Sequence, residues 1–193
     1  MTNSLTLREK LKGDPKTRRV LGDVLPVDLL PKRRLRRTPR LFIINTDDST
    51  GPGEHWVLVF FTGHNRGIYF DSYGLDVMDT RIQDFLTKNC SSYVYNKRPL
   101  HWIFSHTCGF FCFYMGRRLA RGYSLRRVLS DFRTFNTYYN DSLVLRLWLL
   151  NVYLMYLKWC CEKWTVKSIK HCVKIQSVFL VCVLILVGQT PDR

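Results

Sequence analysis

The sequence predicts an α+β domain, and three observations lead to that prediction. Short runs of β-branched and aromatic residues occur between residues 41 and 71, separated by stretches rich in Gly, Asp and Asn. Segments with apolar residues at helical spacing lie around and after them. Grouped strands with helices around them are typical of α+β proteins. At 193 residues, 46% of them hydrophobic, the chain is long enough to bury one core.

Four segments are predicted to be strands. The first three are LFIIN at 41–45, HWVLVFF at 55–61 and GIYFD at 67–71. The turn-rich stretches TDDSTGPGE and TGHNRG separate them, so we expect neighbouring antiparallel strands. A further strand is expected in SYVYN, at 92–96.

Four segments are predicted to be helices. TRIQDFLTK at 80–88 is short, and CGFFCFYMGRRLARG is expected to form a helix that ends at Gly122. SLRRVLSDF begins at Ser124, a residue type that caps helix N-termini. DSLVLRLWLLNVYLMYLKW, from Asp141, is longer and very apolar.

The chain is strongly basic, with 30 Lys and Arg against 15 Asp and Glu, a formal net charge of +15. About half of the excess lies in residues 1–40, which we interpret as a basic N-terminal segment leading to the domain. Lys and Arg that neutralise phosphates bind without sequence preference, so this segment predicts nucleic acid as a nonspecific partner. A solvated arm or a nuclear-import signal explains the same charge, and no recognition motif decides between them.

The seven cysteines are odd in number, and the N-terminus has no apolar run typical of a secretory signal. We therefore expect a reducing compartment, and neither secretion nor a disulfide scaffold. A metal site can be imagined from Cys160, Cys161, His171 and Cys172. Zinc ligands usually come in tighter, repeated pairs, so we expect no metal.

The C-terminal part differs from the rest, and we treat residues 151–193 as an apolar and basic extension. VFLVCVLILV, at 178–187, is an apolar run of ten residues, whereas a membrane-spanning helix needs roughly 20. The segment 143–157 is longer but contains Arg146 and Asn151. We therefore expect a buried element or a tail that does not fold with the domain, and no membrane anchor.

Three residues have the chemistry of a thiol protease. His55 opens a predicted strand and Asp71 closes the next, so antiparallel pairing would bring them to one sheet edge. Cys108 lies at a predicted helix start, where free N–H groups and the helix dipole favour the thiolate. A thiolate, a histidine that exchanges protons with it and a carboxylate that orients the histidine form a nucleophilic triad. Taken singly, each residue is better explained by packing or turn capping, and only the combination favours a catalytic role.

GPGEHW, YFDSYG and SHTCGFFC, in this order and spacing, resemble the adenain family of adenovirus-type cysteine endopeptidases. That family includes relatives in adenovirus-like elements and virus-like DNA transposons, and proteases that remove SUMO-like modifiers are more distant relatives. The likeness covers residues 24–144, about two thirds of the chain, and we place the protease domain at 24–150.

The resemblance implies a papain-like fold of the adenain and SUMO-protease type, a mixed sheet with the nucleophile at a helix N-terminus. It implies Cys108 as nucleophile, His55 as general base and acid, and Asp71 as the group that orients His55. The expected activity is a thiol endopeptidase that cleaves viral or virus-like precursor polypeptides. The backbone N–H of Cys108 would form part of the oxyanion hole.

One departure concerns the oxyanion hole, because the family has a glutamine about seven residues before the cysteine and this chain has His101. An imidazole N–H could donate instead, whereas outright loss of such a donor slows catalysis by roughly 100- to 1,000-fold. We therefore expect a weakened protease. The alternatives are a catalytically impaired relative that binds nucleic acid or protein, and an isopeptidase for ubiquitin-like modifiers.

Cys90 precedes the nucleophile where adenoviral proteases have the cysteine that pairs with a peptide cofactor, and those enzymes are also stimulated by DNA. The resemblance thus implies an activating peptide and DNA as cofactors, although the sequence by itself requires none. The simpler explanation of Cys90, which we favour, is a semi-exposed thiol after a helix. We expect a monomer in the host nucleus, the cytoplasm or the virion.

Overall fold

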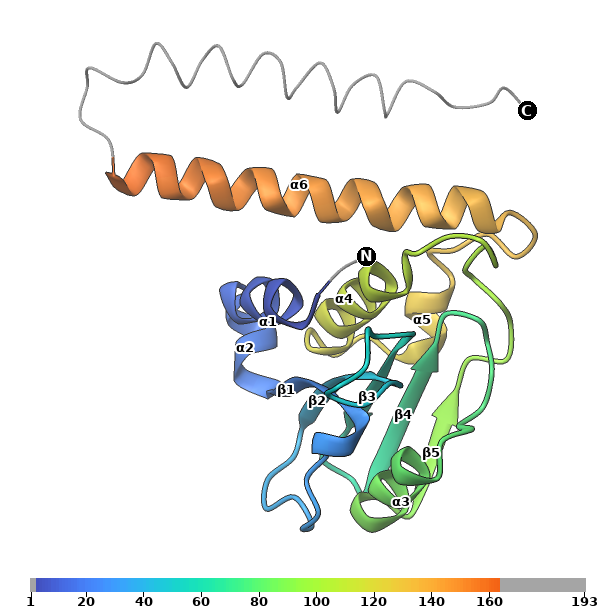
Figure 1. Ribbon diagram of the computed structural model, residues 1–193. Coiled ribbons are helices and arrows are strands. Elements are labelled where there is room, and N and C mark those ends of the chain that lie inside the picture. Colours follow the sequence, from blue (N-terminus) through green and yellow to red (C-terminus); the bar gives the residue numbers. More distant parts are fainter. Residues whose placement is uncertain (1–2, 164–193) are drawn as a thin grey trace. The chain divides into compact units, whose positions relative to one another are not determined.

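A computed structural model describes residues 3–163, and within that range it describes the side chains of residues 3–155. The chain divides into two compact units, Met1–Asp141 and Ser142–Arg193 (Figure 1). The first unit contains the sheet, most of the helices and all the residues singled out above for catalysis. The first unit ends nine residues before the domain boundary expected at residue 150.

A five-stranded sheet forms the centre of the first unit, with the strand order β1-β2-β3-β4-β5. The central pairs β2–β3 and β3–β4 are antiparallel, as expected, and the outer pairs β1–β2 and β4–β5 are parallel. The strands are β1 (Leu21–Pro26), β2 (Arg40–Asn45), β3 (Trp56–Phe61), β4 (Arg66–Asp71) and β5 (Ser92–Tyr95). The prediction of an α+β fold with a mixed sheet is confirmed.

Six α-helices and one 3-10 helix lie within the described residues. They are α1 (Ser4–Gly13), α2 (Pro15–Val20), η1 (Val27–Leu29), α3 (Thr80–Asn89), α4 (Cys108–Leu119), α5 (Leu125–Leu129) and α6 (Thr137–Lys163). The helix α4 stops three residues before Gly122, whose N–H bonds to the carbonyl of Leu119. Ser124 caps α5 as expected, because its Oγ accepts from the N–H of Arg127 at 3.2 Å.

The sheet is buried on both faces, which explains why all six residues of β3 are buried. Val57 and Val59 belong to an apolar cluster with Phe85 and Leu86 of α3. On the other face, α4 approaches β2 and β3 closely at Gly116, where a Cβ would lie 3.0 Å from a methyl of Leu41. Figure 1 shows α3 and α4 on either side of the sheet. The helix that begins with Cys108 is therefore held against the strand that follows His55.

The N-terminal residues are part of the fold, which corrects the expectation of a basic segment leading to it. Residues 4–29 form α1, α2, the edge strand β1 and η1. Leu7 and Leu11 are fully buried, one helical turn apart, while Glu9 and Lys12 are exposed. Only two apolar side chains in this helix are buried, so its amphipathic pattern is too weak to identify among so many Lys and Arg.

Asp14 attaches this N-terminal region to α4. Its carboxylate caps α2 by accepting from the N–H groups of Lys16 and Thr17, at 3.1 and 2.9 Å. It also pairs with Arg117 of α4 and with Arg121, two residues after the end of α4, at 3.1 and 2.5 Å. Hydrogen bonds from Arg121 and Thr17 outweigh burial and lower the pKa of Asp14 well below its usual range.

The helix α6 begins at Thr137, four residues before the predicted start at Asp141. The side chain of Asn136 accepts from the N–H of Tyr139 at 2.8 Å, so an asparagine and not Asp141 caps this helix. Asp141 is instead buried and bonded to the loop that precedes Cys108. The apolar run at 178–187, with His171 and Cys172, lies outside the described residues, and the side chains of Cys160 and Cys161 are not described.

We predict that Asp14→Ala lowers the free energy of unfolding by about 3 kcal/mol, because it removes a helix cap and leaves two arginines without their carboxylate. Urea denaturation followed by circular dichroism measures this loss. Asp84→Ala, at an exposed position on α3, is the matched control and should change stability by less than about 0.5 kcal/mol. Equal stability of the two variants would contradict the role of Asp14.

Candidate functional site

His55 and Asp71 meet at one edge of the sheet because of the way β3 and β4 pair. In this antiparallel ladder, Val57 lies opposite Asp71. His55 precedes Val57 by two residues, so its side chain is on the same face as that of Asp71 and diagonal to it. Nε2 of His55 lies 2.9 Å from Oδ1 of Asp71. The structure thus brings together two residues that the sequence placed at the ends of adjacent strands.

The position of Asp71 is fixed by Asn96, a buried residue that sequence reasoning missed. The side chain of Asn96 accepts from the N–H of Asp71 at 3.1 Å and donates to its carbonyl at 2.5 Å. The carboxylate of Asp71 also accepts from the N–H of Tyr73 at 2.8 Å. An asparagine just after a β-strand gives no sequence signal for this role, because its partner is 25 residues away.

Cys108 is the first residue of α4 and is buried, with 5% of its surface exposed. The first N–H groups of α4 that bond to a carbonyl of this segment are those of Phe110 and Phe111, which donate to Thr107. The N–H of Cys108 precedes them and is therefore among the first-turn groups that no helix carbonyl satisfies. One turn further, the thiol of Cys112 donates to the carbonyl of Trp56 at 3.2 Å. This bond attaches α4 to the residue after His55.

The charge state of His55 is set by opposing effects. Burial by itself lowers the pKa of the ring, because desolvation disfavours the charged form. Hydrogen bonds to Asp71 and Cys108, together with the negative charge of both groups, outweigh burial and raise the pKa of His55 to about 9. The ring is therefore cationic at neutral pH, and an imidazolium beside a cysteine stabilises the thiolate.

His101, expected near the oxyanion, lies behind the site with both ring nitrogens engaged. Its Nδ1 is 3.2 Å from Oγ of Ser72, and its Nε2 is 2.6 Å from Oγ of Ser105. The residue is 3% exposed. Burial and the positive charge of His55 lower the pKa of His101 to about 4, so the ring is neutral at neutral pH.

Three aromatic rings form a stack that connects the two histidines. Tyr73 stacks on His55, with ring centroids 4.9 Å apart, and on His101, with centroids 4.6 Å apart. The turn that carries Tyr73 is tight, since Gly74 has φ +76° and a Cβ there would collide with the backbone of Arg98. Tyr73 therefore covers one face of the His55 ring. The stack depends on Gly74, because no other residue fits the turn that carries Tyr73.

Cys90 is separate from this site. Its thiol donates to the carbonyl of Leu86 at 3.3 Å, and the residue is 7% exposed within the cluster between the sheet and α3. Burial raises the pKa of this thiol. The expected semi-exposed thiol is therefore wrong, and the packing does not favour a disulfide with a peptide cofactor.

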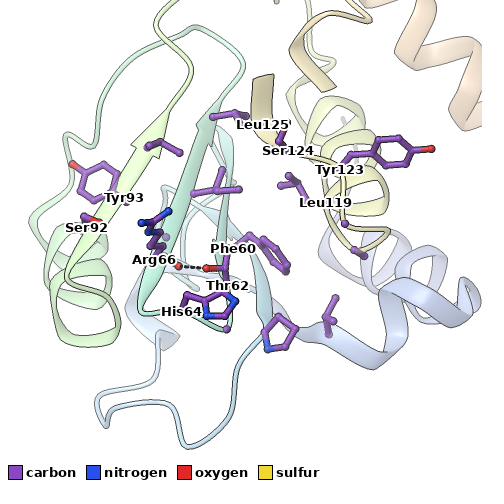
Figure 2. A pocket seen from close by; sticks show the side chains of 18 residues that line it. Phe60, Thr62, His64, Arg66, Ser92, Tyr93, Leu119, Tyr123, Ser124 and Leu125 are labelled. Atoms are coloured by element: carbon purple, nitrogen blue, oxygen red, sulfur yellow. Dashed lines mark hydrogen bonds between the residues drawn. The ribbon is translucent and has the colours of Figure 1, made fainter. Parts of the chain in front are cut away.

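A cavity of about 980 Å³ is not lined by His55, Asp71 or Cys108. It lies near the far end of β3, and the residues around it include Phe60, Thr62, Arg66, Tyr93 and Leu125 (Figure 2). His55 precedes the first residue of β3, whereas Phe60 and Thr62 are at its other end. The candidate active site is therefore defined by its side-chain chemistry and not by cavity size.

Among residues 3–163, no group of three or more His, Cys, Asp or Glu side chains is arranged to hold a metal ion. In the same range, no helix has the length and hydropathy that a membrane crossing requires.

Comparison with known proteins gives little further information. The chain matches no protein-family model, and no curated protein matches it. Among solved structures, it is similar to the crystal structure of the selenomethionine ASFV pS273R protease, with 22% sequence identity and a TM-score of 0.39. The match covers 52% of this chain and 42% of that chain. We rest no conclusion on so weak a likeness.

The raised pKa of His55 predicts a loss of stability as the pH rises. A histidine whose pKa is 6.5 when unfolded and about 9 when folded stabilises the native state fully below pH 6.5, and this stabilisation is lost between pH 6.5 and 9. We expect the free energy of unfolding to fall by up to about 3 kcal/mol over this window. Urea denaturation at half-unit pH steps measures it.

His55→Ala should lack this alkaline decrease, whereas His64→Ala, at an exposed turn position, should retain it. A decrease of the same size in His55→Ala and wild-type protein would show that His55 is not stabilised as an imidazolium.

Proposed function

We propose that this protein is a thiol endopeptidase in which Cys108 is the nucleophile, His55 the general acid and base, and Asp71 the orienting carboxylate. The observation that carries this proposal is the position of the His55 ring, which bonds to Asp71 at 2.9 Å and also hydrogen-bonds to Cys108. Since Nε2 is engaged by Asp71, Nδ1 is the nitrogen that remains for the sulfur.

In the proposed reaction, the Cys108 thiolate attacks the scissile carbonyl carbon and forms a tetrahedral oxyanion. The oxyanion collapses, the C–N bond breaks, and the His55 imidazolium gives its proton to the leaving amine. Neutral His55 then takes a proton from water, whose oxygen attacks the thioester. The acid product leaves, and Cys108 and His55 return to the ion pair.

The N–H of Cys108, at the start of α4, is the proposed donor to the oxyanion. The sequence offered His101 as a second donor in place of the family glutamine. Both nitrogens of His101 have partners within the chain, so we do not assign it this role. With one donor fewer, we expect a rate roughly 100- to 1,000-fold below that of a complete site.

The substrate class is part of the proposal. The motifs around His55, Asp71 and Cys108 resemble those of adenain-type proteases, and the mixed sheet with Cys108 at a helix N-terminus fits a papain-like fold of that type. We therefore propose precursor polypeptides of a viral or virus-like element as substrates. An isopeptidase for ubiquitin-like modifiers would use the same three side chains.

We predict that Cys108 reacts with iodoacetamide with a pH midpoint at least roughly two units below the 8.5 of a free cysteine, because an imidazolium stabilises its thiolate. Peptide mapping by mass spectrometry follows Cys108 separately from Cys90 and Cys112, whose burial raises their pKa values. His55→Ala should move the Cys108 midpoint up to that of a free thiol, and His64→Ala should leave it unchanged.

Cleavage of denatured casein and of a modifier–coumarin conjugate then distinguishes the endopeptidase from the isopeptidase. Cys108→Ala should abolish either activity. A Cys108 midpoint near 8.5 in the wild-type protein would refute the proposed nucleophile.

A second candidate function is nonspecific nucleic-acid binding, favoured by the loop between η1 and β2. Its exposed arginines are Arg33, Arg34, Arg36 and Arg37. The loop is attached to α3, because Asn89 accepts from the N–H of Leu35 at 2.8 Å and Lys88 donates to the carbonyl of Lys32 at 3.0 Å. A fixed loop with several cations is suited to contact phosphates.

We predict that the double variant Arg36→Ala with Arg37→Ala reduces the slope of log affinity against log salt by roughly 2, one unit for each lost phosphate contact. Fluorescence anisotropy with a labelled 20-base-pair DNA measures the slope. Arg126→Ala with Arg127→Ala, on α5, is the matched control. If both double variants keep the wild-type slope, the loop is not the binding site.

A further inference from the structure

A chain of polar side chains, three of them buried and two half-buried, leads to the residue before Cys108 and is not used by the proposed reaction. It runs through Ser72, His101, Ser105, Thr107 and Asp141. The successive distances are 3.2, 2.6, 2.8 and 2.6 Å. One end follows Asp71, and Thr107 precedes Cys108. The chain therefore joins the segments that carry the orienting carboxylate and the nucleophile.

Asp141 is the terminal acceptor of this chain and is 6% exposed. One carboxylate oxygen accepts from the N–H of Trp102 at 3.1 Å, and the other accepts from the hydroxyl of Thr107 at 2.6 Å. An ionised carboxylate only accepts hydrogen bonds. Thr107 must therefore donate its one hydroxyl proton to Asp141.

The remaining bonds follow because each hydroxyl has one proton. Thr107 has none left for Ser105, so Ser105 donates to Thr107. Ser105 in turn has none left for His101, so Nε2–H of the neutral ring donates to Ser105. Nδ1 of His101 then accepts from Ser72. One carboxylate thus fixes the direction of four consecutive hydrogen bonds.

We propose that Asp141 is a positioning residue that orders this chain, sets the Nε2–H tautomer of His101, and so holds the segment 101–107 that delivers Cys108. The inference rests on the proposed function for its catalytic consequence, while the tautomer follows from the hydrogen bonds alone. His101 has no N–H left for an oxyanion, and its ring supports Tyr73, on which His55 stacks.

The contrary case is an arrangement in which the hydrogen bonds between Asp141 and Ser72 all run in the opposite direction. The backbone nitrogen of Thr107 lies 3.4 Å from Nε2 of His101, which is long for a hydrogen bond. A bond from this N–H to Nε2 would require Nε2 to be the unprotonated nitrogen. That direction would need a protonated Asp141 to donate to Thr107. The two arrangements differ in which nitrogen of His101 holds the proton, so they can be separated by experiment.

The first test is the tautomer of His101, read from the ¹⁵N shifts of its ring at pH 8, where carboxylates are ionised. The wild-type protein should have the Nε2–H form. In Asp141→Asn, the carbonyl oxygen must accept from Trp102, so the amide NH₂ donates to Thr107. The chain then reverses, and His101 should change to the Nδ1–H form.

Asp84→Asn, at an exposed position on α3, is the matched control and should keep the Nε2–H form. An Nδ1–H form in the wild-type protein, or an unchanged tautomer in Asp141→Asn, would overturn the inference. Neither result depends on catalytic activity.

The second test removes the hydroxyl that joins Asp141 to Ser105, in Thr107→Val. We expect kcat on casein to fall by roughly 10- to 100-fold, with KM changed by less than about threefold, because the nucleophile is misplaced while substrate binding is kept. Thr87→Val, where the hydroxyl bonds only within α3, should match the wild type. Equal kcat values for the two variants would overturn the positioning role.

Failure of the proposed function gives a different pattern. If the wild-type protein cleaves nothing and Cys108 titrates as a free thiol, the protease proposal fails. The tautomer of His101 then decides the inference alone: a change of tautomer in Asp141→Asn upholds the chain, and no change overturns it.

Discussion

The antiparallel register of β3 and β4 is the constraint on which the site depends. Because Val57 pairs with Asp71, His55 lies diagonal to the Asp71 carboxylate on the same face of the sheet. A slip of one residue would turn Asp71 to the other face of the sheet and separate the pair. The register is secured by burial on both faces, since every residue of β3 is buried and a slip would exchange the sets that contact α3 and α4.

Burial also explains why so many polar residues around His55, Asp71 and Cys108 are bonded to one another. Ser72, Asn96, His101 and Asp141 are each at most 6% exposed, and a buried polar group without a partner costs about 1–3 kcal/mol. Asn96 satisfies the backbone of Asp71, while Asp141 ends the chain behind Cys108. Different partners separate the two histidines, since burial lowers the pKa of both, while Asp71 and Cys108 raise that of His55 and leave it protonated, and His101 remains neutral.

The arginines of this basic chain have two different roles in the structure. Arg117 of α4 and Arg121 just after it pair with the buried carboxylate of Asp14 and so attach the N-terminus of α2 to the C-terminal end of α4. The arginines of the loop after η1 are exposed and available to a partner. Net charge alone did not separate these roles, because an arginine that is paired within the fold and one that is solvated contribute equally to the composition.

The sequence by itself determined the strands β2 to β5, the start of α4 and the order of His55, Asp71 and Cys108, because period, turn residues and chain order are local properties. The tertiary structure alone decided that residues 4–29 fold, that Asn136 caps α6 and that Cys90 is buried. It also decided the partners of His101 and Asp141. Ser72 is 29 residues from His101 and Thr107 is 34 residues from Asp141, and only the packing of the sheet and helices brings such distant side chains within hydrogen-bond distance.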